Sequence, residues 1–290
     1  MNKTSVEYTI FAPAKVNIHL AVKEKRPDGF HNLESIFLAV DFGDTLHFIL
    51  KKGGGSGSNT AKITMSGRGF DTENSPFPQE KNIVFKALSL FRVKTGFSHD
   101  IEIKVEKRIP LGGGLGGGSS DAAATLLALN ELAGFPLDFE ALLDLAAALG
   151  SDVPFFIHRV PAAKVTGRGE CIQPIDLPLK HFVLVNPGFE SDTKAAYKLL
   201  DEYRDLNGFS TGSKTNFFND FLDVFNDPEK SVYNKIISQL IELGAEFASL
   251  SGAGSTCFGV FPESESAQTA VSVLRKVYGF VEYCRTNQEP

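Results

Sequence analysis

Residues 110–120 read Pro110-Leu111-Gly112-Gly113-Gly114-Leu115-Gly116-Gly117-Gly118-Ser119-Ser120. Before them, apolar and charged residues alternate from Ile101 to Glu106, as in a strand with one face in water. After them, the Ala- and Leu-rich run 122–133 predicts a helix that Ser119-Ser120-Asp121 caps and Gly134 ends. A glycine-rich loop that opens a helix exposes backbone N–H groups, which bind phosphate. The pattern therefore predicts a phosphate-binding strand–loop–helix unit.

The common phosphate-binding motifs do not explain this loop. Walker A requires a lysine directly after its last glycine, and Gly118 stands there instead. A dinucleotide fold requires an acidic residue at the end of a second strand, whereas Glu131 lies inside the predicted helix. Asp41-Phe42-Gly43 spells the D-F-G of protein kinases, but it precedes the loop and the sequence has no H-R-D, so we interpret it as a turn. A floppy linker is disfavoured because Leu115 is apolar and a helix follows directly.

Composition and charge exclude several classes of protein. The 290 residues carry 29 Lys and Arg against 35 Asp and Glu, a net charge of −6, which argues against a nucleic acid polymer or an anionic membrane surface as the main partner. Hydrophobic residues make up 42% of the chain, as in an ordinary globular protein. Residues 201–246 hold nine acidic and four basic residues, a net charge of −5, which we interpret as a solvated face.

The cysteines and the apolar runs indicate in which cellular compartment the protein is expected. Cys171, Cys257 and Cys284 stand far apart without a C-x-x-C pair, so neither a disulfide framework nor a zinc site is predicted. No apolar run reaches the roughly 18 residues of a membrane span, and the N-terminus lacks the apolar region of a signal peptide. We therefore expect a cytoplasmic protein without a membrane partner, either a monomer or a homodimer.

The periodicity of the chain predicts two α+β halves that meet near residue 160. In the first half, strands are predicted near residues 16–22, 45–50, 61–65 and 101–105, and helices over 82–94, 122–133 and 139–149. The glycine-rich residues 53–57 are interpreted as a flexible hairpin connection. Beyond Pro161 the pattern restarts, with strands near 163–165, 181–185, 246–250 and 256–261 and helices near 194–203, 230–243 and 264–277.

Four polar residues, in three stretches of the sequence, are candidates for a site. Lys15 and Asn17 are two residues apart and point to the same side of a strand, although solvent-facing alternation is the favoured interpretation of such a pair taken alone. Asp152 lies between a helix end and the run Val-Pro-Phe-Phe-Ile, so its carboxylate is partly desolvated; a structural role and a catalytic base are both open. His31 follows the turn Asp28-Gly29-Phe30, where a histidine is more often an incidental surface group.

Three ordered motifs resemble those of the GHMP kinases: Pro13-Ala14-Lys15-Val16-Asn17, the loop 112–120 and Ser251-Gly252-Ala253-Gly254. Arg26-Pro27-Asp28-Gly29-Phe30-His31-Asn32-Leu33 and Ser151-Asp152-Val153-Pro154 are similar to one branch, which phosphorylates the 2-hydroxyl of 4-diphosphocytidyl-2-C-methyl-D-erythritol in the non-mevalonate route to isoprenoids. The resemblance implies an α+β fold of two domains. Residues 1–160 would resemble ribosomal protein S5 domain 2 and residues 161–290 would be ferredoxin-like, with ATP and substrate in the cleft between them.

The resemblance also implies roles for individual residues. Asp152 would be the general base, and Lys15 the cation beside it. The loop would bind ATP, with a hydroxyl of Ser119 or Ser120 near Mg²⁺. The cytosine would be held by His31 and by Phe30, which stands where the family usually has Tyr. The implied ATP-binding residues are Pro110, Leu111, Gly112, Gly113, Gly114, Leu115, Gly116, Gly117, Gly118, Ser119 and Ser120, and the implied substrate-binding residues are Asn17, Phe30, His31, Thr193, Gly252 and Gly254.

Two other functions remain open at the level of the sequence. A GHMP kinase acting on homoserine, mevalonate or a sugar would share Lys15, the loop and Gly252, but is not expected to carry Asp28-Gly29-Phe30-His31. A non-catalytic nucleotide-binding member is disfavoured because Lys15 and Asp152 are both retained.

Overall fold

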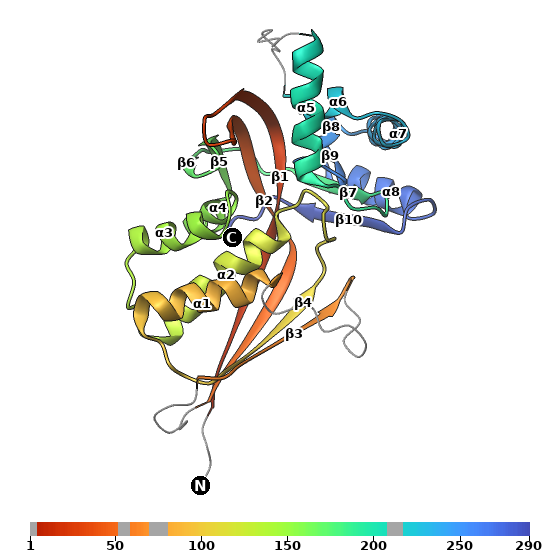
Figure 1. Cartoon of the computed structure of the whole chain (residues 1–290). Coiled ribbons are helices and arrows are strands. Elements are labelled where there is room, and N and C mark those ends of the chain that lie inside the picture. Colours follow the sequence, from red (N-terminus) through yellow and green to blue (C-terminus); the bar gives the residue numbers. More distant parts are fainter. Residues whose placement is uncertain (1–4, 52–58, 70–80, 208–216) are drawn as a thin grey trace.

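The computed structural model describes residues 5–51, 59–69, 81–207 and 217–290, which form two sheets with helices packed on them (Figure 1). The α+β organisation predicted from the sequence is therefore confirmed. The first sheet contains β1 (Ser5–Lys25), β2 (His31–Lys51), β3 (Ala61–Gly67), β4 (Ile101–Lys107), β5 (Ala162–Gly167) and β6 (Cys171–Pro174). The second contains β7 (His181–Asn186), β8 (Phe247–Leu250), β9 (Cys257–Phe261) and β10 (Phe280–Arg285), in the order β10-β7-β9-β8.

The first sheet is organised around the long antiparallel strands β1 and β2. They pair from Ser5 opposite Lys51 to Lys25 opposite His31, and the other strands extend in the order β3-β4-β2-β5-β6. Strand β4 lies between β2 and β3, and β3 runs parallel to it. The hairpin predicted between residues 45–50 and 61–65 is therefore wrong, while the glycine-rich residues 53–57 lie outside the described residues.

Asp41-Phe42-Gly43 is not the predicted turn but a β-bulge inside β2. Pro13 pairs with Gly43 and Ala14 with Val40, so the two residues between have no partner in β1. A glycine is needed at the bulge, because a Cβ at position 43 would lie 2.2 Å from a main-chain oxygen of β1. The strand therefore continues through a segment whose composition suggested that it ends.

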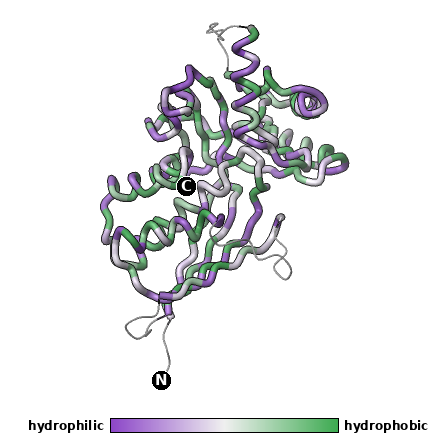
Figure 2. The backbone as a smooth tube through the Cα atoms, viewed as in Figure 1, coloured by the Kyte–Doolittle hydropathy of each residue, from purple (hydrophilic) through white to green (hydrophobic). Residues whose placement is uncertain are grey.

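The helices divide between the two sheets. Those packed with the first sheet are α1 (Ile83–Thr95), α2 (Gly117–Leu132), α3 (Phe139–Leu149) and α4 (Val153–His158). Those of the second half are α5 (Thr193–Asn207), α6 (Phe221–Val224), α7 (Glu229–Glu242) and α8 (Ser264–Leu274). Hydrophobic and hydrophilic residues alternate along these helices (Figure 2), as expected for helices that bury one face. The predicted helix over 82–94 is confirmed as α1, with the side chain of Asn82 accepting from the N–H of Val84.

The two halves share an apolar interface. Alternate residues of β1, namely Ala14, Val16 and Ile18, pack in one buried cluster with Phe182 of β7 and Phe258 of β9. The residues between them on β1, Lys15 and Asn17, are also buried. Strand β1 is thus covered on both faces in its middle, and its two buried polar residues lie on the face opposite this interface.

The division of the chain at residue 160 does not coincide with the division between sheets. Strand β5 pairs with residues 33–38 of β2, and β6 pairs with β5, so both belong to the first sheet although they follow Pro161. The chain enters the second sheet at β7. A domain boundary placed between residues 160 and 161 would therefore cut the first sheet; by strand pairing the boundary falls after Pro174.

Candidate active site

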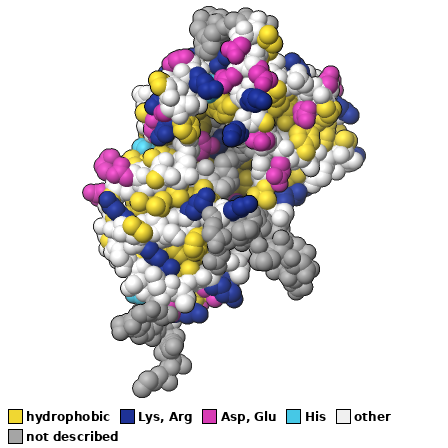
Figure 3. All heavy atoms as spheres, viewed as in Figure 1, with side chains coloured by type: hydrophobic (Ala, Val, Ile, Leu, Met, Phe, Trp, Pro, Cys, Tyr) yellow, Lys and Arg dark blue, Asp and Glu magenta, His cyan; other side chains and the backbone are white. Residues whose placement is uncertain are grey.

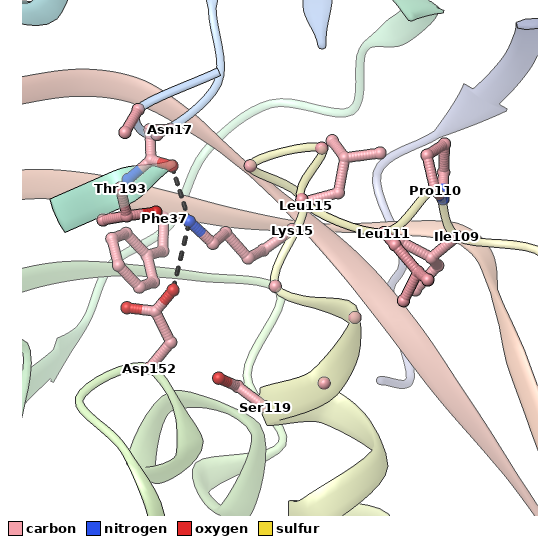
Figure 4. A pocket seen from close by; sticks show the side chains of 18 of the residues that line it. Lys15, Asn17, Phe37, Ile109, Pro110, Leu111, Leu115, Ser119, Asp152 and Thr193 are labelled. Carbon is pink, nitrogen blue, oxygen red and sulfur yellow. Dashed lines mark hydrogen bonds and ion pairs between the residues drawn. The ribbon is translucent and has the colours of Figure 1, made fainter. Parts of the chain in front are cut away.

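A cavity of about 360 Å³ lies where the glycine loop, β1, α4, α5 and the loop after β8 meet. Its lining includes the predicted loop residues from Pro110 to Ser119, together with Lys15, Asn17, Asp152, Thr193 and Gly252. Figure 4 shows the Lys15 ammonium between the side chains of Asn17 and Asp152. The structure thus brings together three motifs that lie far apart in the sequence.

Lys15 is buried, with only 3% of its surface exposed. Its Nζ lies 2.7 Å from Oδ1 of Asn17 and 3.3 Å from Oδ2 of Asp152, and 4.6 Å from the centre of the Phe37 ring. Its backbone N–H donates to the carbonyl of Leu115 in the glycine loop at 3.0 Å. A buried ammonium group requires such partners to offset its desolvation. The position of the Lys15 side chain is therefore fixed from β1, α4 and the loop together.

Asp152 occupies the N-cap position of α4, but its side chain makes no capping hydrogen bond. The carboxylate turns to Lys15 instead, and 29% of the side chain remains exposed. It is the one carboxylate among the described lining residues of the cavity. Asp152 is thus partly desolvated, as the sequence predicted, and it can still contact a ligand.

The glycine loop has the backbone that binding through amides requires. Gly112, Gly114 and Gly116 have φ values of 58°, 74° and 70°, in the left-handed region that favours glycine. A Cβ at Gly114 would lie 2.1 Å from the carbonyl oxygen of Ser251. Apart from Gly113, whose amide closes the turn at 111–112, no amide from 112 to 119 donates a hydrogen bond to the described residues. These N–H groups are therefore available to an anion in the cavity.

The carbonyl groups of the loop are held by the second half of the chain. The carbonyl of Gly112 accepts from the N–H groups of Ser191 at 3.0 Å and Ser255 at 3.3 Å, and that of Gly113 accepts from Thr256 at 3.1 Å. The carbonyl of Gly114 accepts from the Ser251 hydroxyl at 2.9 Å. The loop is thus anchored by the second half through its carbonyl groups, while most of its amides remain free.

Helix α2 begins earlier than the sequence suggested. Gly116 is its N-cap residue and forms no side-chain cap, so Ser119-Ser120-Asp121 lies inside the helix rather than before it. Ser119 lines the cavity, whereas Ser120 is buried, lines a separate small cavity, and has a hydroxyl without a partner among the described residues. The two serines therefore differ, and of the two only Ser119 lines the cavity of the glycine loop (Figure 4).

Behind Ser119 and Ser120, a buried ionic cluster ties the two ends of the loop together. Lys107, the last residue of β4, forms ion pairs with Asp44 and Asp121, and all three side chains are almost completely buried. Asp44 also accepts from the N–H groups of Arg108 and Ile109. Burial, together with the nearby Asp44 charge and against the opposing charge of Lys107, raises the pKa of Asp121 to about 7. The sequence motifs did not identify this cluster.

A second cavity of about 960 Å³ adjoins the first, and Leu33, Asp152, Thr193 and Tyr197 line both. His31 and Phe30 belong to this second cavity. Asp152 therefore lies between the glycine loop and His31 and Phe30, the residues predicted to bind the cytosine ring.

The two ring residues of the second cavity differ in exposure. Phe30 is half exposed, and the Arg168 guanidinium lies over its ring at 5.0 Å from the centroid. His31 is buried, stacks on Tyr197 with ring centroids 5.1 Å apart, and pairs through Nε2 with Asp201 Oδ1 at 2.7 Å. Burial, with a smaller effect of the Asp152 charge, raises the pKa of Tyr197, so its hydroxyl stays protonated.

Sequence reasoning missed Asp201, Tyr197 and Arg168. Asp201 lies in the acidic segment 201–246 that was interpreted as a solvated face, and its contact with His31 shows that this interpretation is wrong at that residue. Acidic and basic side chains are intermixed over the visible face of the second half (Figure 3). The missed signal was the i, i+4 spacing of Tyr197 and Asp201, which puts an aromatic ring and a carboxylate on one face of α5.

The remaining predicted residues lie at different distances from the cavities. Thr193 begins α5 and lines both cavities. Gly252 lines the first, with a φ of 57°. Gly254 packs against the Tyr233 hydroxyl and Leu250 and is not part of either lining. The side chain of Asn17 is occupied on both sides, because its Oδ1 accepts from Lys15 and its Nδ2 donates to Ser35.

The described residues lack two features that mark other classes of protein. There, no cluster of three or more His, Cys, Asp or Glu side chains is placed to hold a metal ion. Across the same ranges, no helix combines the length and the apolar character needed to cross a membrane. The three cysteines are free thiols, as predicted.

Comparisons with known proteins agree with this geometry. The sequence model of the GHMP kinases N terminal domain matches residues 82–159, and that of the GHMP kinases C terminal domain matches residues 195–279. The 4-diphosphocytidyl-2-C-methyl-D-erythritol kinase of Thermodesulfovibrio yellowstonii is 38% identical over 285 residues, covering 91% of this chain and 93% of that protein. The enzyme of that name from Burkholderia thailandensis is 35% identical over 279 residues, covering 91% of this chain and 88% of that protein.

Solved structures lead to the same family. The crystal structure of a 4-(cytidine 5'-diphospho)-2C-methyl-D-erythritol kinase matches with a TM-score of 0.75 and 29% identity, covering 96% of this chain and 98% of that one. Homoserine kinase from Cytophaga hutchinsonii matches with a TM-score of 0.67 and 21% identity, covering 100% and 96%, a likeness of fold alone. From its sequence relatives and its fold, the chain belongs to the GHMP kinases and, within them, to the family of the 4-diphosphocytidyl-2-C-methyl-D-erythritol kinases.

Proposed function

We propose that this protein transfers the γ-phosphoryl group of ATP to the 2-hydroxyl of 4-diphosphocytidyl-2-C-methyl-D-erythritol, giving the 2-phosphate and ADP. The observation that carries the proposal is the place of Asp152, paired with Lys15 on the wall between the glycine-loop cavity and the cavity of His31 and Phe30. A carboxylate at that junction can reach both a phosphate bound by the loop and the alcohol of a substrate whose cytosine ring lies in the second cavity.

The glycine loop is the proposed site of the ATP phosphates. Apart from that of Gly113, its amides from residues 112 to 119 have no other hydrogen-bond acceptor among the described residues, and the loop leads into the N-terminus of α2. Backbone dipoles at a helix N-terminus favour negative charge, so the loop binds phosphate without a Walker lysine. Of the residues predicted for this role, Ser120 is excluded from the proposal because it faces the other side of α2.

Asp152 is the proposed general base. The acceptor oxygen attacks the γ-phosphorus, the bond to the oxygen that bridges the β- and γ-phosphorus atoms breaks, and the hydroxyl proton passes to a carboxylate oxygen of Asp152. Lys15 stabilises the negative charge that develops on the alcohol oxygen and on the phosphoryl group. Asn17 was predicted to orient the diol; since Lys15 and Ser35 occupy its amide, we propose that it positions Lys15 instead.

The second cavity is the proposed site of the cytidine diphosphate end of the substrate. His31 and Phe30 supply a hydrogen-bonding ring and an exposed aromatic face, and Thr193 stands between the two cavities. Arg168 and Lys194 line the same space and can pair with phosphate oxygens. Gly252, from the loop after β8, lines the first cavity and is proposed to contact substrate. Gly254 is proposed to set the conformation of that loop rather than to contact substrate.

Mg²⁺ fits the residues that line the first cavity. The ion prefers oxygen ligands and is commonly held by substrate phosphates, water and one or two protein groups. The Ser119 hydroxyl is the protein oxygen placed for this role, which leaves the Asp152 carboxylate free to accept the proton of the alcohol. When bound, the ion would offset negative charge on the phosphates of ATP.

A coupled assay of ADP release tests the proposed activity. The protein is given the diphosphocytidyl alcohol, homoserine and mevalonate in parallel, and we expect turnover with the first alone. Asp152→Asn serves as the inactive control, and Asp144→Asn, an exposed carboxylate on α3, as the matched surface control. Equal or greater turnover with homoserine or mevalonate would contradict the assignment, and no turnover with any alcohol would favour a binding protein.

A further inference from the structure

We propose that Asp201 is a positioning residue that fixes His31 in the form protonated on Nε2, so that Nδ1 accepts a hydrogen bond from the 4-amino group of cytosine. This inference rests on the proposed function and names the residue that sets its preference for cytidine over uridine. It arises from a buried histidine whose partner lies in a part of the sequence without any recognised motif.

The pairing between Asp201 and His31 is short and shielded. Asp201 Oδ1 lies 2.7 Å from His31 Nε2, and the His31 side chain is only 5% exposed. The second carboxylate oxygen, Oδ2, accepts from Lys25 Nζ at 2.6 Å. Burial raises the pKa of Asp201, but the hydrogen bonds from Lys25 and His31 outweigh it and hold the pKa below its ordinary value. The carboxylate is therefore ionised at neutral pH, and it can only accept a hydrogen bond.

The plane of the His31 imidazole ring is fixed by α5, the helix that also carries Asp201. Tyr197 stacks on His31 with an interplanar angle of 23°, and Phe221 holds Tyr197 by an edge contact with centroids 5.0 Å apart. Tyr197 and Asp201 are four residues apart on α5, so one helix face supplies both the stacking ring and the hydrogen-bond acceptor. The ring of His31 can neither rotate nor tilt without losing one of these contacts.

The chemistry of the ring follows from this arrangement. Since the carboxylate only accepts, Nε2 carries the proton, and in the neutral ring Nδ1 is then an acceptor. None of the described residues forms a hydrogen bond with Nδ1. Cytosine presents an amino donor at position 4 and uracil a carbonyl oxygen, so a fixed acceptor attracts the first base and repels the second. Discrimination of this kind requires that the protein group cannot change its hydrogen-bonding sense.

The kinetic test compares Asp201→Asn with Glu202→Gln. Glu202 is the next residue on α5, is exposed and pairs only with Lys198 among the described residues, so its substitution removes the same charge without touching His31. An asparagine can turn its NH₂ group to Nε2 and so permit the opposite tautomer. In Asp201→Asn we expect the KM for the diphosphocytidyl substrate to rise roughly 10- to 100-fold, while the KM for ATP stays unchanged. Glu202→Gln should leave both KM values unchanged.

Selectivity is measured by calorimetry with CDP and UDP while the ATP site is saturated with a non-hydrolysable ATP analogue. The wild type and Glu202→Gln should prefer CDP, and Asp201→Asn should bind the two nucleotides within a few-fold of each other. A retained preference for CDP in Asp201→Asn would overturn the proposed role in selectivity. An equal rise in KM for ATP and for the alcohol would reduce Asp201 to a structural residue.

A spectroscopic test needs neither a substrate nor a variant of Asp201. The nitrogen shifts of the six histidines are recorded on ¹⁵N-histidine-labelled wild-type protein at about pH 8, above the ordinary pKa of histidine, and His31 is assigned with His31→Ala. A protonated Nε2 with an unprotonated Nδ1 is expected. The opposite tautomer or a doubly protonated ring would overturn the proposal, whatever alcohol the protein phosphorylates. The expected tautomer in a protein that fails the kinase assay would instead count against the proposed function.

Discussion

Lys15 Nζ lies 3.3 Å from Asp152 Oδ2, and the pair joins strand β1 to the first residue before helix α4. Lys15 is buried and Asp152 is partly exposed, so one member is fixed and the other can meet a ligand. The two residues therefore act as one unit, and their substitutions should not be additive.

Asp152→Asn is expected to lower kcat by about 10²- to 10⁴-fold, because the amide cannot accept the proton of the alcohol. Lys15→Met should lower kcat to a similar extent, and the double variant should be little worse than either single one. Steady-state kinetics with both substrates measures these effects. Lys164→Met, in an exposed pair with Glu34, is the matched control and should stay near wild-type activity. Wild-type turnover in Asp152→Asn would contradict the assignment of the base.

Gly114→Ala is expected to damage the phosphate loop. Its φ is 74°, and the new Cβ would lie 2.1 Å from the carbonyl oxygen of Ser251, so the loop or its anchor must move. We expect a loss of about 1–3 kcal/mol in the free energy of unfolding and at least a tenfold rise in the KM for ATP. Urea unfolding and ATP saturation curves provide the measurements.

Gly118→Ala is the control for that prediction. Gly118 is inside α2, and the nearest atom to a new Cβ there is Ile83 Cγ2 at 3.8 Å. The free energy of unfolding should therefore stay unchanged or rise by up to about 1 kcal/mol. A similar loss of stability in both variants would show that the contact with Ser251 is not the cause.

His31→Ala is expected to raise the KM for the diphosphocytidyl alcohol far more than the KM for ATP, because the ring lines the second cavity and not the first. His47→Ala, an exposed ring on β2 that contacts Thr9, should change neither constant. Equal effects of His31→Ala on the two substrates would contradict the division of the site into two cavities.

Asp121→Asn is expected to change how stability depends on pH. The pKa of Asp121 is raised to about 7 in the folded protein, above the roughly 3.9 of an unfolded chain. Between these values the folded state binds more protons, so wild-type stability falls as pH rises from about 4 to about 7. The stability of the Asp121→Asn variant does not depend on this proton. Its free energy of unfolding should therefore rise relative to that of wild type as the pH increases from about 4 to about 7. Urea unfolding at several pH values measures the difference, with Asp144→Asn as control; a constant difference would contradict the raised pKa.

Local patterns in the sequence were sufficient for much of the fold. The alternation at 101–106 and the helices over 82–94 and 139–149 depend on neighbouring residues, and the structure confirms each. Asp41-Phe42-Gly43 misled because turn-forming residues also suit a bulge, and only the partner strand distinguishes the two. The run after Asp152 was too short and too apolar to be assigned, and it forms α4.

The site was predictable where a motif carries its own chemistry and not where contacts are distant. The glycine loop was singled out because its residue types are unusual in themselves, and Lys15 was singled out because its motif resembles one of the GHMP kinases. Asp201 was not identified, because nothing in the neighbouring sequence distinguishes one aspartate in an acidic helix from another. Its role depends on its contact with His31, which lies on β2 and is distant in the sequence. Likewise, nothing near Pro161 indicates that β5 returns to the first sheet, because strand pairing is decided across the fold.

The hydrogen bonds that anchor the loop carbonyls have a mechanical consequence. The donors to residues 112–114 all come from segments around Ser191, Ser251 and Thr256, in the second half of the chain. The conformation of the loop therefore depends on both halves of the chain. Under the proposed function, a motion that separates the halves would break these hydrogen bonds, so release of ADP and loosening of the loop would be coupled.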